Sequence, residues 1–593
     1  MVRLFSAVWN LFLFLLPVQS TDYPYGLYLD RDHRLDFKWN VDYGLGLVRF
    51  KITVVSLIGE WFGVGFSDHG ETNNADFMIY WTSATNVHHF QDAWTDSDSL
   101  LHVDKHQDYH LVKAVSQTGS PTVLQFYREI DTCDPRDYQF DNGTTHILFF
   151  ISQGTPSSKK FVNVTTLHPG LQRVQLLKPN MPTASMPDDV WTIDVVNPHI
   201  EVPAEETTYW WYVTRFPPLK HKHHIIKYDG VIQKGHEGLV HHMEVFHCEL
   251  SKDEIVRDYN GPGFAEGKPP ELEACRNVIG AWAMGAKPLV FPEEAGSPIG
   301  GTNYNRYVLL EVHYNNPDKK TGLVDASGIR FYVTSQLRKN DAGIMELGLE
   351  YTNKMAIPPR QELFSLTGYC IADCTKIGLP PEGIYIFASQ LHTHLTGWRV
   401  YTKHVREGVE LPEVNRDDHY SPHFQEIRGL PQPVLILPGD ALLTVCDYKT
   451  MDRPNATIGG FAITDEMCVN YIHYYPRVNL EVCKSSIDTV TLDSYFRFMN
   501  KWNDDDTSPA KGDRANYNSI RWSRLHAYLL NVLYTTSPLS MQCNQSDGSR
   551  FPGDWEKKPL TKLLFPLPPI ERHCPSTMEQ ILAPLMSPQK SRI

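Results

Sequence analysis

The sequence predicts a mainly β protein that begins with a β-sandwich, continues through a longer β-rich region and ends in a small, partly helical region. Short stretches in which apolar and polar residues alternate recur along most of the chain between turn residues, as in β-sandwiches. Helical patterns appear only after residue 491. The length of 593 residues exceeds what one core can organise, which indicates three or four domains.

The predicted N-terminal sandwich spans residues 35–152. Leu35–Val41, Leu47–Val55 and Val123–Tyr127 alternate apolar with polar residues, so each is expected to form a strand with one buried face. A Pro/Ser-rich stretch, Gln153–Ser158, marks the end of this domain.

The β-rich region follows a second, proline-containing linker at residues 179–187. Strand patterns then continue from about residue 191 to 490, interrupted by Pro-Gly turns. Beyond them, Tyr495–Met499 and Leu525–Leu533 have helical spacing and flank an acidic loop, so residues 491–593 are expected to form a partly helical region and a tail.

The N-terminus predicts export. A positive start, an apolar stretch from Leu4 to Leu16 and small residues before Ser20 are typical of a secretory signal peptide over residues 1–20. An uncleaved membrane anchor is the less favoured alternative, because the stretch is short for a spanning helix. Ten cysteines and four glycosylation sequons agree with a secreted protein or one in the lumen of the ER or secretory vesicles. The sequons lie at Asn142, Asn163, Asn455 and Asn544.

Charge and motifs exclude several functions. The formal net charge is -14 and no long basic run occurs, so nucleic acid is not an expected partner. The chain lacks a Gly-rich phosphate loop and a Gly-x-Ser-x-Gly nucleophile elbow. His236-Glu237 does not open a His-Glu-x-x-His zinc motif, because Val240 occupies the second histidine position.

Histidine pairs are the first candidate metal ligands. Among 26 histidines, three adjacent pairs occur, at 88–89, 223–224 and 241–242. Neighbouring residues on a regular strand point to opposite faces, so a pair that shares one metal requires a bulge or an irregular backbone. Spacing alone does not choose among the three pairs.

His392 and His394 form a better-placed candidate, because they follow the strand-like run Ile384–Ala388. Residues two apart on a strand share a face, so both imidazoles could reach one metal. Met467 could supply a third, soft ligand that favours Cu(I), although most methionines fill cores.

Several of these stretches together resemble the copper type II, ascorbate-dependent monooxygenases, in their dopamine β-hydroxylase-like branch. The resemblance covers nearly the whole mature chain, and residues 35–150 resemble the DOMON β-sandwich that precedes the catalytic domains in that branch. The stretches are Leu239–Val245, Leu310–Tyr314, Gln390–Gly397, His419–Glu426 and Glu466–Cys468.

The resemblance implies two β-sandwich catalytic domains, at residues 175–340 and 341–490, which hold two coppers. One set of ligands serves electron transfer and the other serves hydroxylation, and a catalytic role is implied for Tyr209 with His392. The implied ligand sets are His241, His242 and His313 for the first copper, and His392, His394 and Met467 for the second.

The implied function is hydroxylation of an activated C–H bond of a small amine or phenolic substrate, such as a phenylethylamine, by O2 with ascorbate as electron donor. One alternative is dopamine β-hydroxylase itself, which converts dopamine to noradrenaline. Peptide hydroxylation is less favoured, because the first domain resembles the other branch. An alternative of another class is an extracellular copper-binding module that has lost catalysis. The sequence leaves the natural substrate open.

The resemblance also implies a disulfide pairing and some departures from dopamine β-hydroxylase. Trp211 and Gly263 replace the two halves of a further bridge in that enzyme, and its subunit-linking cysteines are missing from residues 500–511. A covalent dimer is therefore not expected, a non-covalent oligomer stays open, and a DBH-like paralogue is preferred. The implied pairs are Cys133–Cys574, Cys248–Cys275, Cys370–Cys483, Cys374–Cys543 and Cys446–Cys468.

Overall fold

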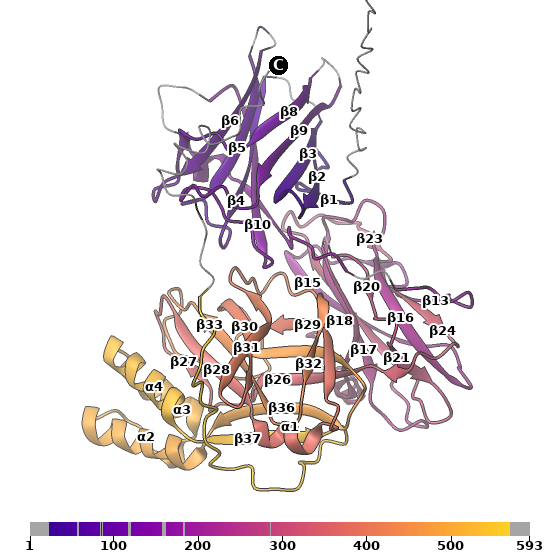
Figure 1. Cartoon of the computed structure of the whole chain (residues 1–593), viewed down its shortest axis with the longest axis vertical. Helices are drawn as coiled ribbons and strands as arrows, with labels where there is room; N and C mark the ends of the chain where they lie inside the picture. The colour runs from indigo at the N-terminus through magenta and orange to yellow at the C-terminus, as the bar shows by residue number, and fades with distance from the viewer. Residues whose placement is uncertain are drawn as a thin grey trace, which may run out of the picture.

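The computed structural model describes residues 23–569 and residue 574, apart from short gaps at 56–58, 84, 86, 117–119, 157–161, 182–183 and 285. Strands dominate the described chain, as predicted, and they form three units, which we call the first (residues 25–174), second (191–341) and third (343–545) units. In Figure 1 the first unit lies at the top, the second to the right and the third below. The predicted signal peptide, residues 1–20, lies outside the described residues.

The first unit is a sandwich of two antiparallel sheets. Alternate residues of β2 and β3 are buried, including Trp39 and Phe50, so the strands predicted at Leu35–Val41 and Leu47–Val55 are confirmed. One sheet has the order β1 (Tyr25–Tyr28), β2 (Leu35–Asp42), β3 (Leu47–Val54), β9 (Thr122–Glu129), β8 (His110–Val115). The other has the order β11 (Val162–Asn163), β7 (Leu100–Val103), β6 (His88–Thr95), β5 (Asp76–Thr82), β4 (Glu60–Ser67), β10 (Thr145–Gln153), β12 (Gly170–Val174).

The first unit is longer than the predicted 35–152 span at both ends. The strand β12 lies beyond the Pro/Ser-rich stretch, yet it returns to pair with β10, with Leu148 opposite Leu171. At the other end, β1 pairs with β2. Because strands of two to five residues carry little periodicity, the sequence pattern did not show them.

The second unit is another pair of sheets, joined by an apolar core that includes Tyr314 and Phe331. The outer sheet contains β13 (Trp191–Val196), β24 (Gly328–Thr334), β16 (Lys222–Val231), β21 (Ala295–Gly300), β25 (Asn340–Asp341) and β20 (Leu289–Val290). The inner sheet contains β18 (Asn260–Pro262), β15 (Thr207–Arg215), β22 (Tyr307–Asn315), β17 (Val240–Cys248) and β19 (Cys275–Ala283). A small pair is formed by β14 (Ile200–Glu201) and β23 (Val324–Asp325).

The third unit packs a six-stranded sheet against a four-stranded sheet. The larger sheet has the order β32 (Arg428–Ile436), β29 (Ile384–His392), β35 (Val469–Tyr475), β26 (Gly343–Leu349), β36 (Leu480–Ile487), β37 (Leu539–Gln545). The smaller has the order β28 (Phe364–Cys370), β33 (Asp440–Tyr448), β30 (Gly397–Arg406), β31 (Val409–Asp417). The short elements are β27 (Ala356–Ile357), β34 (Thr457–Ile458) and helix α1 (Ala372–Gly378).

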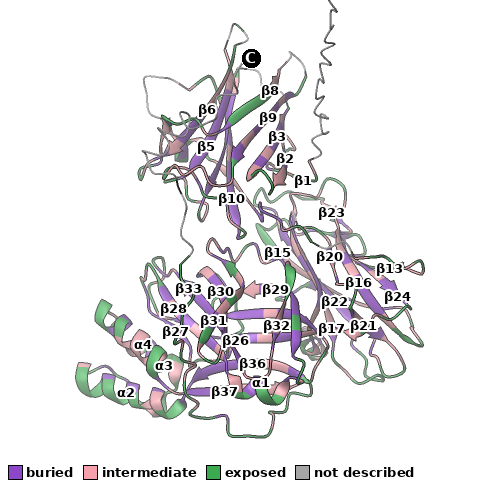
Figure 2. Ribbon diagram, in the orientation of Figure 1, coloured by how far each residue is buried: buried purple, intermediate pink, exposed green. Residues whose placement is uncertain are grey.

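Three helices follow, and each predicted helical stretch lies within one of them. They are α2 (Thr489–Asn503), α3 (Asp513–Ser519) and α4 (Arg524–Thr536). Asp488 caps α2 by accepting a hydrogen bond from the backbone N–H of Thr491, and α2 buries residues three or four apart, including Leu492, Phe496 and Met499. Each of the three helices also has an exposed face (Figure 2). The C-terminal region is not only helical, because β37 returns to the edge of the large sheet. Across the described ranges, no helix combines the length and apolar character that crossing a membrane requires.

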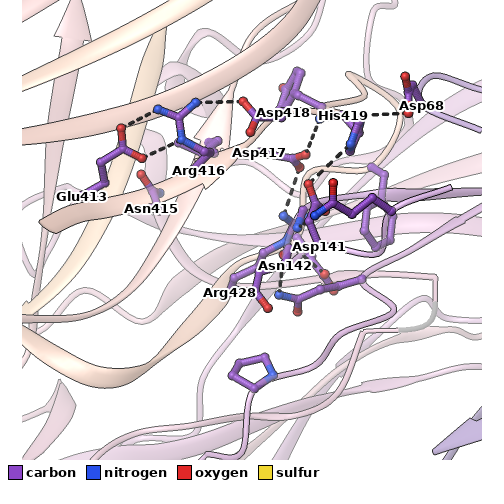
Figure 3. Close-up of a pocket in the computed structure, with 18 of the residues that line it drawn as sticks. Asp68, Asp141, Asn142, Glu413, Asn415, Arg416, Asp417, Asp418, His419 and Arg428 are labelled. Atoms are coloured by element: carbon purple, nitrogen blue, oxygen red, sulfur yellow. Dashed lines mark hydrogen bonds and ion pairs between the residues drawn. The ribbon is translucent and has the colours of Figure 1, made fainter. Parts of the chain in front are cut away.

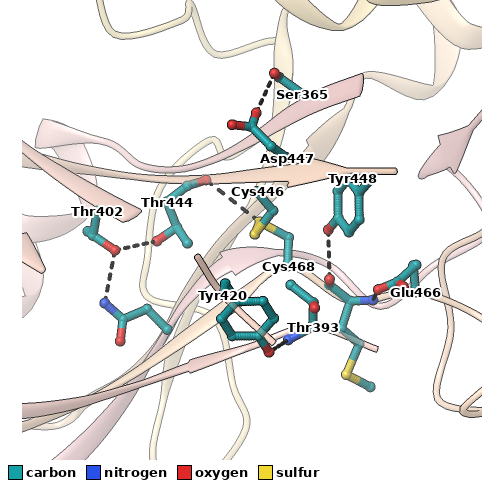
Figure 4. Close-up of a disulfide and its surroundings, with 12 residues drawn as sticks. Ser365, Thr393, Thr402, Tyr420, Thr444, Cys446, Asp447, Tyr448, Glu466 and Cys468 are labelled. Carbon is teal, nitrogen blue, oxygen red and sulfur yellow. Dashed lines mark hydrogen bonds between the residues drawn. A yellow bond between two sulfur atoms is a disulfide. The ribbon is translucent and has the colours of Figure 1, made fainter. Parts of the chain in front are cut away.

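Five disulfides join the ten cysteines, in the pairs that the resemblance implies. The Cys133–Cys574 bridge ties the first unit to the C-terminal tail. The Cys446–Cys468 bridge links β33 to the residue before β35 inside the third unit, beside Tyr448 and Glu466 (Figure 4).

The first unit docks on the third through buried polar contacts. Asp417 accepts hydrogen bonds from the backbone N–H of Thr144 at 2.9 Å and from its hydroxyl at 2.6 Å, and pairs with Arg428 at 3.0 Å. Nearby, the ring of His419 lies 3.7 Å from a carboxylate oxygen of Asp68 and 3.4 Å from one of Asp141 (Figure 3). A cavity of about 1170 Å³ borders this interface.

We expect Asp417→Ala to weaken this docking strongly. The change leaves the buried guanidinium of Arg428 with Glu426 as its remaining carboxylate, and breaking a buried pair in this way costs about 3 kcal/mol. The midpoint of urea unfolding should fall, and amide exchange around Thr144 should accelerate. Asp418→Ala is the matched control, because Asp418 is half-exposed and its pair with Arg416 contributes less than about 1 kcal/mol. Equal effects of the two changes would contradict this account of the interface.

Candidate metal centres

The first cluster of metal-ligating side chains lies on the inner sheet of the second unit. His241 and His242 come from β17 and His313 from the neighbouring β22. The pairing of β17 with β22 shifts register between Val240 and His242, which is the irregularity that two adjacent ligands require. Nδ1 of His242 lies 3.2 Å from Nδ1 of both other histidines.

The three imidazoles are neutral at neutral pH. Burial, followed by the charges of neighbouring imidazoles, holds the pKa of His241 and His242 well below the ordinary value. For His313, burial and then His423 lower the pKa to about 4. Neutral imidazole is the ligand form, and ligand nitrogens of all three residues lie within 4.8 Å of one another. The cluster therefore fits a copper ion.

Tyr209 lies against this first cluster. It stands opposite His313 in the β15–β22 ladder and stacks on that ring, with centroids 4.5 Å apart. Its ring also meets His242 edge-on at 6.0 Å. Burial raises the pKa of Tyr209 to about 12, so the phenol keeps its proton at neutral pH.

The second candidate set lies in the third unit. His392 ends β29, whereas His394 lies just beyond the strand, so the two histidines do not share a regular strand face as expected. Instead, the buried carboxylate of Glu466 accepts hydrogen bonds from the backbone N–H groups of His394 at 2.8 Å and Met467 at 3.1 Å. Glu466 thereby ties the histidine loop to the segment that carries Met467.

Hydrogen bonds also fix which ring nitrogens can bind a metal. The Gln425 amide NH2 donates to the carbonyls of Thr393 and Pro422, so its oxygen must accept from Nδ1 of His392, at 2.6 Å. Nδ1 of His394 donates to the carbonyl of Asp465 at 3.1 Å. Nε2 of each ring keeps its lone pair. Burial, and then the neighbouring His394, lowers the pKa of His392 to about 4.

The two clusters lie on facing surfaces of the second and third units. Gln390 of β29 donates a hydrogen bond to Glu244 of β17 at 3.1 Å. The apolar core continues across the same boundary, where the rings of Phe291 and Phe387 lie 5.3 Å apart.

The other histidine pairs have different partners. His224 pairs with Asp341 at 2.8 Å, and His88 contacts the hydroxyl of Tyr80 at 2.6 Å. Of the three adjacent pairs, the structure brings only 241–242 together with a third histidine in the part of the chain it describes.

Sequence reasoning assigned no role to three residues beside the clusters. Gln425 and Glu466 orient the second set, and His423 lies with its ring 6.4 Å from that of His241. All three belong to stretches that carry the family resemblance, but nothing in their spacing indicates a role.

Comparisons with known proteins now identify the family. "Copper type II ascorbate-dependent monooxygenase, N-terminal domain" matches residues 193–321, the C-terminal domain of the same family matches 340–496, and "DOMON domain" matches 31–153. The chain belongs to the copper type II, ascorbate-dependent monooxygenases. It is 47% identical to dopamine beta-hydroxylase of Equus caballus, over 94% of this chain and 91% of that one. It is 40% identical to tyramine beta-hydroxylase of Caenorhabditis briggsae, over 87% of each chain, and 32% identical to "DBH-like monooxygenase protein 1" of Mus musculus, over 91% and 88%.

These matches confirm the predicted family, mainly β fold, DOMON domain and dependence on copper and ascorbate. Identity is higher to dopamine beta-hydroxylase than to the DBH-like protein, so the preference for a DBH-like paralogue gains no support.

We expect Gln425→Leu to weaken copper binding by the second set. Without the amide oxygen, Nδ1 of His392 loses its acceptor and the ring loses its orientation, which typically lowers metal affinity 10–100-fold. Competition with a chelator should detect one weakened copper per chain. Gln361→Leu is the control, because that amide bonds to the carbonyl of Pro359 in another loop. Tight binding of both coppers by Gln425→Leu would refute the orienting role.

Proposed function

We propose that His241, His242 and His313 hold one copper and that His392, His394 and Met467 hold the other. The convergence of three neutral, buried imidazole nitrogens in the first cluster is the observation that carries this proposal. In the second set, two oriented imidazoles suit both copper oxidation states, and a thioether favours Cu(I).

When bound, copper supplies one-electron redox chemistry through which O2, with electrons from ascorbate, hydroxylates a C–H bond. The chain contributes positioned groups. Gln425 and the carbonyl of Asp465 hold the two histidine rings with Nε2 free. Tyr209 orders His313 by stacking and remains a protonated hydrogen-bond donor, which supports the catalytic role proposed for it with His392.

The proposed substrate is a phenylethylamine, hydroxylated at its benzylic carbon. The names of the relatives support this class, since they are hydroxylases of dopamine and tyramine at the β position. Conversion of dopamine to noradrenaline is one candidate within the class. The five disulfides fit a lumenal or secreted protein. Glycosylation is proposed for the four sequons, of which Asn142 and Asn455 are exposed and Asn163 and Asn544 are partly buried.

Met467→Ala tests the assignment. We expect the wild-type protein to bind two coppers per chain and to give an oxygen- and ascorbate-dependent product from at least one member of a phenylethylamine panel. Met467→Ala should reduce product formation at least 100-fold while the first cluster keeps its copper, because only the soft ligand of the second set is lost. Met186→Ala, at an exposed methionine, should behave as wild type.

Two outcomes would redirect the proposal. A wild-type protein that binds fewer than two coppers would refute the two-site assignment. Full copper loading without product from any amine would instead favour a copper-binding module that has lost catalysis.

A further inference from the structure

Arg173 is a charged side chain without a counterion. It lies on β12, the strand that ends the first unit, and its Nε is buried without a hydrogen-bond partner. Within the described part of the chain, its guanidinium has no carboxylate within 4.0 Å and makes no hydrogen bond. Burial lowers its pKa to about 10, which leaves it charged at neutral pH. Enclosing an unpaired charge is costly, and a bound anion would offset that cost.

Two cavities adjoin Arg173, and each is lined by residues of both the first unit and the catalytic units. One, of about 330 Å³, is also lined by His241 of the first histidine cluster. The other, of about 350 Å³, is also lined by His146 and His423. Both volumes suit a small organic molecule.

The second cavity is the better anion site. The first contains the carboxylates of Asp30, Asp32 and Asp318, which outnumber the guanidiniums of Arg31 and Arg173 and would repel an anion. In the second, Lys449 lies 3.7 Å from Glu71, and Asp452 lies 3.5 Å from Arg453, so these charges are matched. The charge left unmatched on its wall is that of Arg173.

Three imidazoles line this cavity; that of His69 stacks on Trp398, and those of His146 and His423 are the two considered as ligand contacts. His146 is only 1% exposed, and its Nδ1 has no hydrogen-bond partner in the structure as described. His423 reaches toward the first cluster, with its ring 6.4 Å from the ring of His241. A ligand held by Arg173 and these imidazoles would therefore lie next to the histidines proposed to accept electrons.

Ascorbate is the anion that this position suits. It is a monoanion at neutral pH, whereas the chain carries a formal net charge of -14 that disfavours anions elsewhere on the surface. Its adjacent enediol oxygens match the planar fork of a guanidinium, which binds paired oxygens through two N–H groups.

We propose that Arg173, with His146 and His423, binds the ascorbate monoanion and delivers its electron at the His241 edge of the first cluster. This inference rests on the proposed function and gives the first unit a part in it. Each ascorbate releases one electron and one proton and leaves as the radical anion. Two such steps supply the two electrons and two protons with which O2 yields one inserted oxygen atom and one water.

Binding to the copper-free protein tests the site without turnover. Anaerobic calorimetry with ascorbate should show one site per chain, weakened at least tenfold in Arg173→Gln and less in Arg173→Lys, which keeps the charge. Arg330→Gln is the charge-matched control, because Arg330 pairs with Asp194 at an exposed position. Unchanged binding in Arg173→Gln would overturn the proposal. Displacement of ascorbate by equal concentrations of chloride would also overturn it, since the site would then hold any anion.

Steady-state kinetics distinguish a failure of this inference from a failure of the proposed function. With the copper-loaded enzyme, Arg173→Gln should raise KM for ascorbate at least tenfold with little change in kcat. Turnover with hydroquinone, a neutral reductant, should match wild type. An equal loss with both reductants would indicate structural damage and overturn the proposal, whereas a wild-type enzyme inactive with either reductant would refute the proposed function instead.

Discussion

The buried carboxylate of Glu466 is the interaction on which the second candidate centre depends. It accepts four hydrogen bonds from the chain, two from Thr396 and one each from the backbone N–H groups of His394 and Met467. Burial raises its pKa to about 7, while these donors oppose the rise. Since all four partners donate, the loop is built for the ionised form, which only accepts. The adjoining Cys446–Cys468 bridge fixes the same segment covalently.

The placement of the two candidate centres relative to each other depends on how the units pack together. Each histidine set lies on one sandwich, and the Gln390–Glu244 hydrogen bond and the Phe291–Phe387 contact hold the two sandwiches together. The first unit also contacts the third unit, where Thr144 donates two hydrogen bonds to Asp417. Small changes at these boundaries would alter the distance and orientation between the two sets of ligands while leaving each set intact.

Strand and helix patterns with clear periodicity were predictable from the sequence. The strands β2, β3 and β9 and the helices α2 and α4 lie where alternation or helical spacing placed them. The short strand β12 and the returning strand β37 were not predictable, because their pairing is set by distant partners and not by local pattern.

The candidate site was predictable in part. Spacing alone could not select 241–242, because the decisive feature is a register shift against β22. His394 was expected to share a strand face with His392, but it lies in a loop whose position is set by the hydrogen bond from its backbone N–H to Glu466. Gln425 and Arg173 carry no local signal, because their significance arises from what the fold places beside them.

Burial also prepares the first cluster for metal. An imidazole must be neutral to bind a metal, so a histidine that is protonated in the free protein makes affinity depend on pH. Here burial and mutual repulsion keep His241 and His242 neutral, and the pKa of His313 lies near 4. At neutral pH, the cluster can therefore take up a metal ion without releasing protons. An ion that binds the folded cluster and not the unfolded chain stabilises the fold, which links the stability of this part of the protein to metal occupancy.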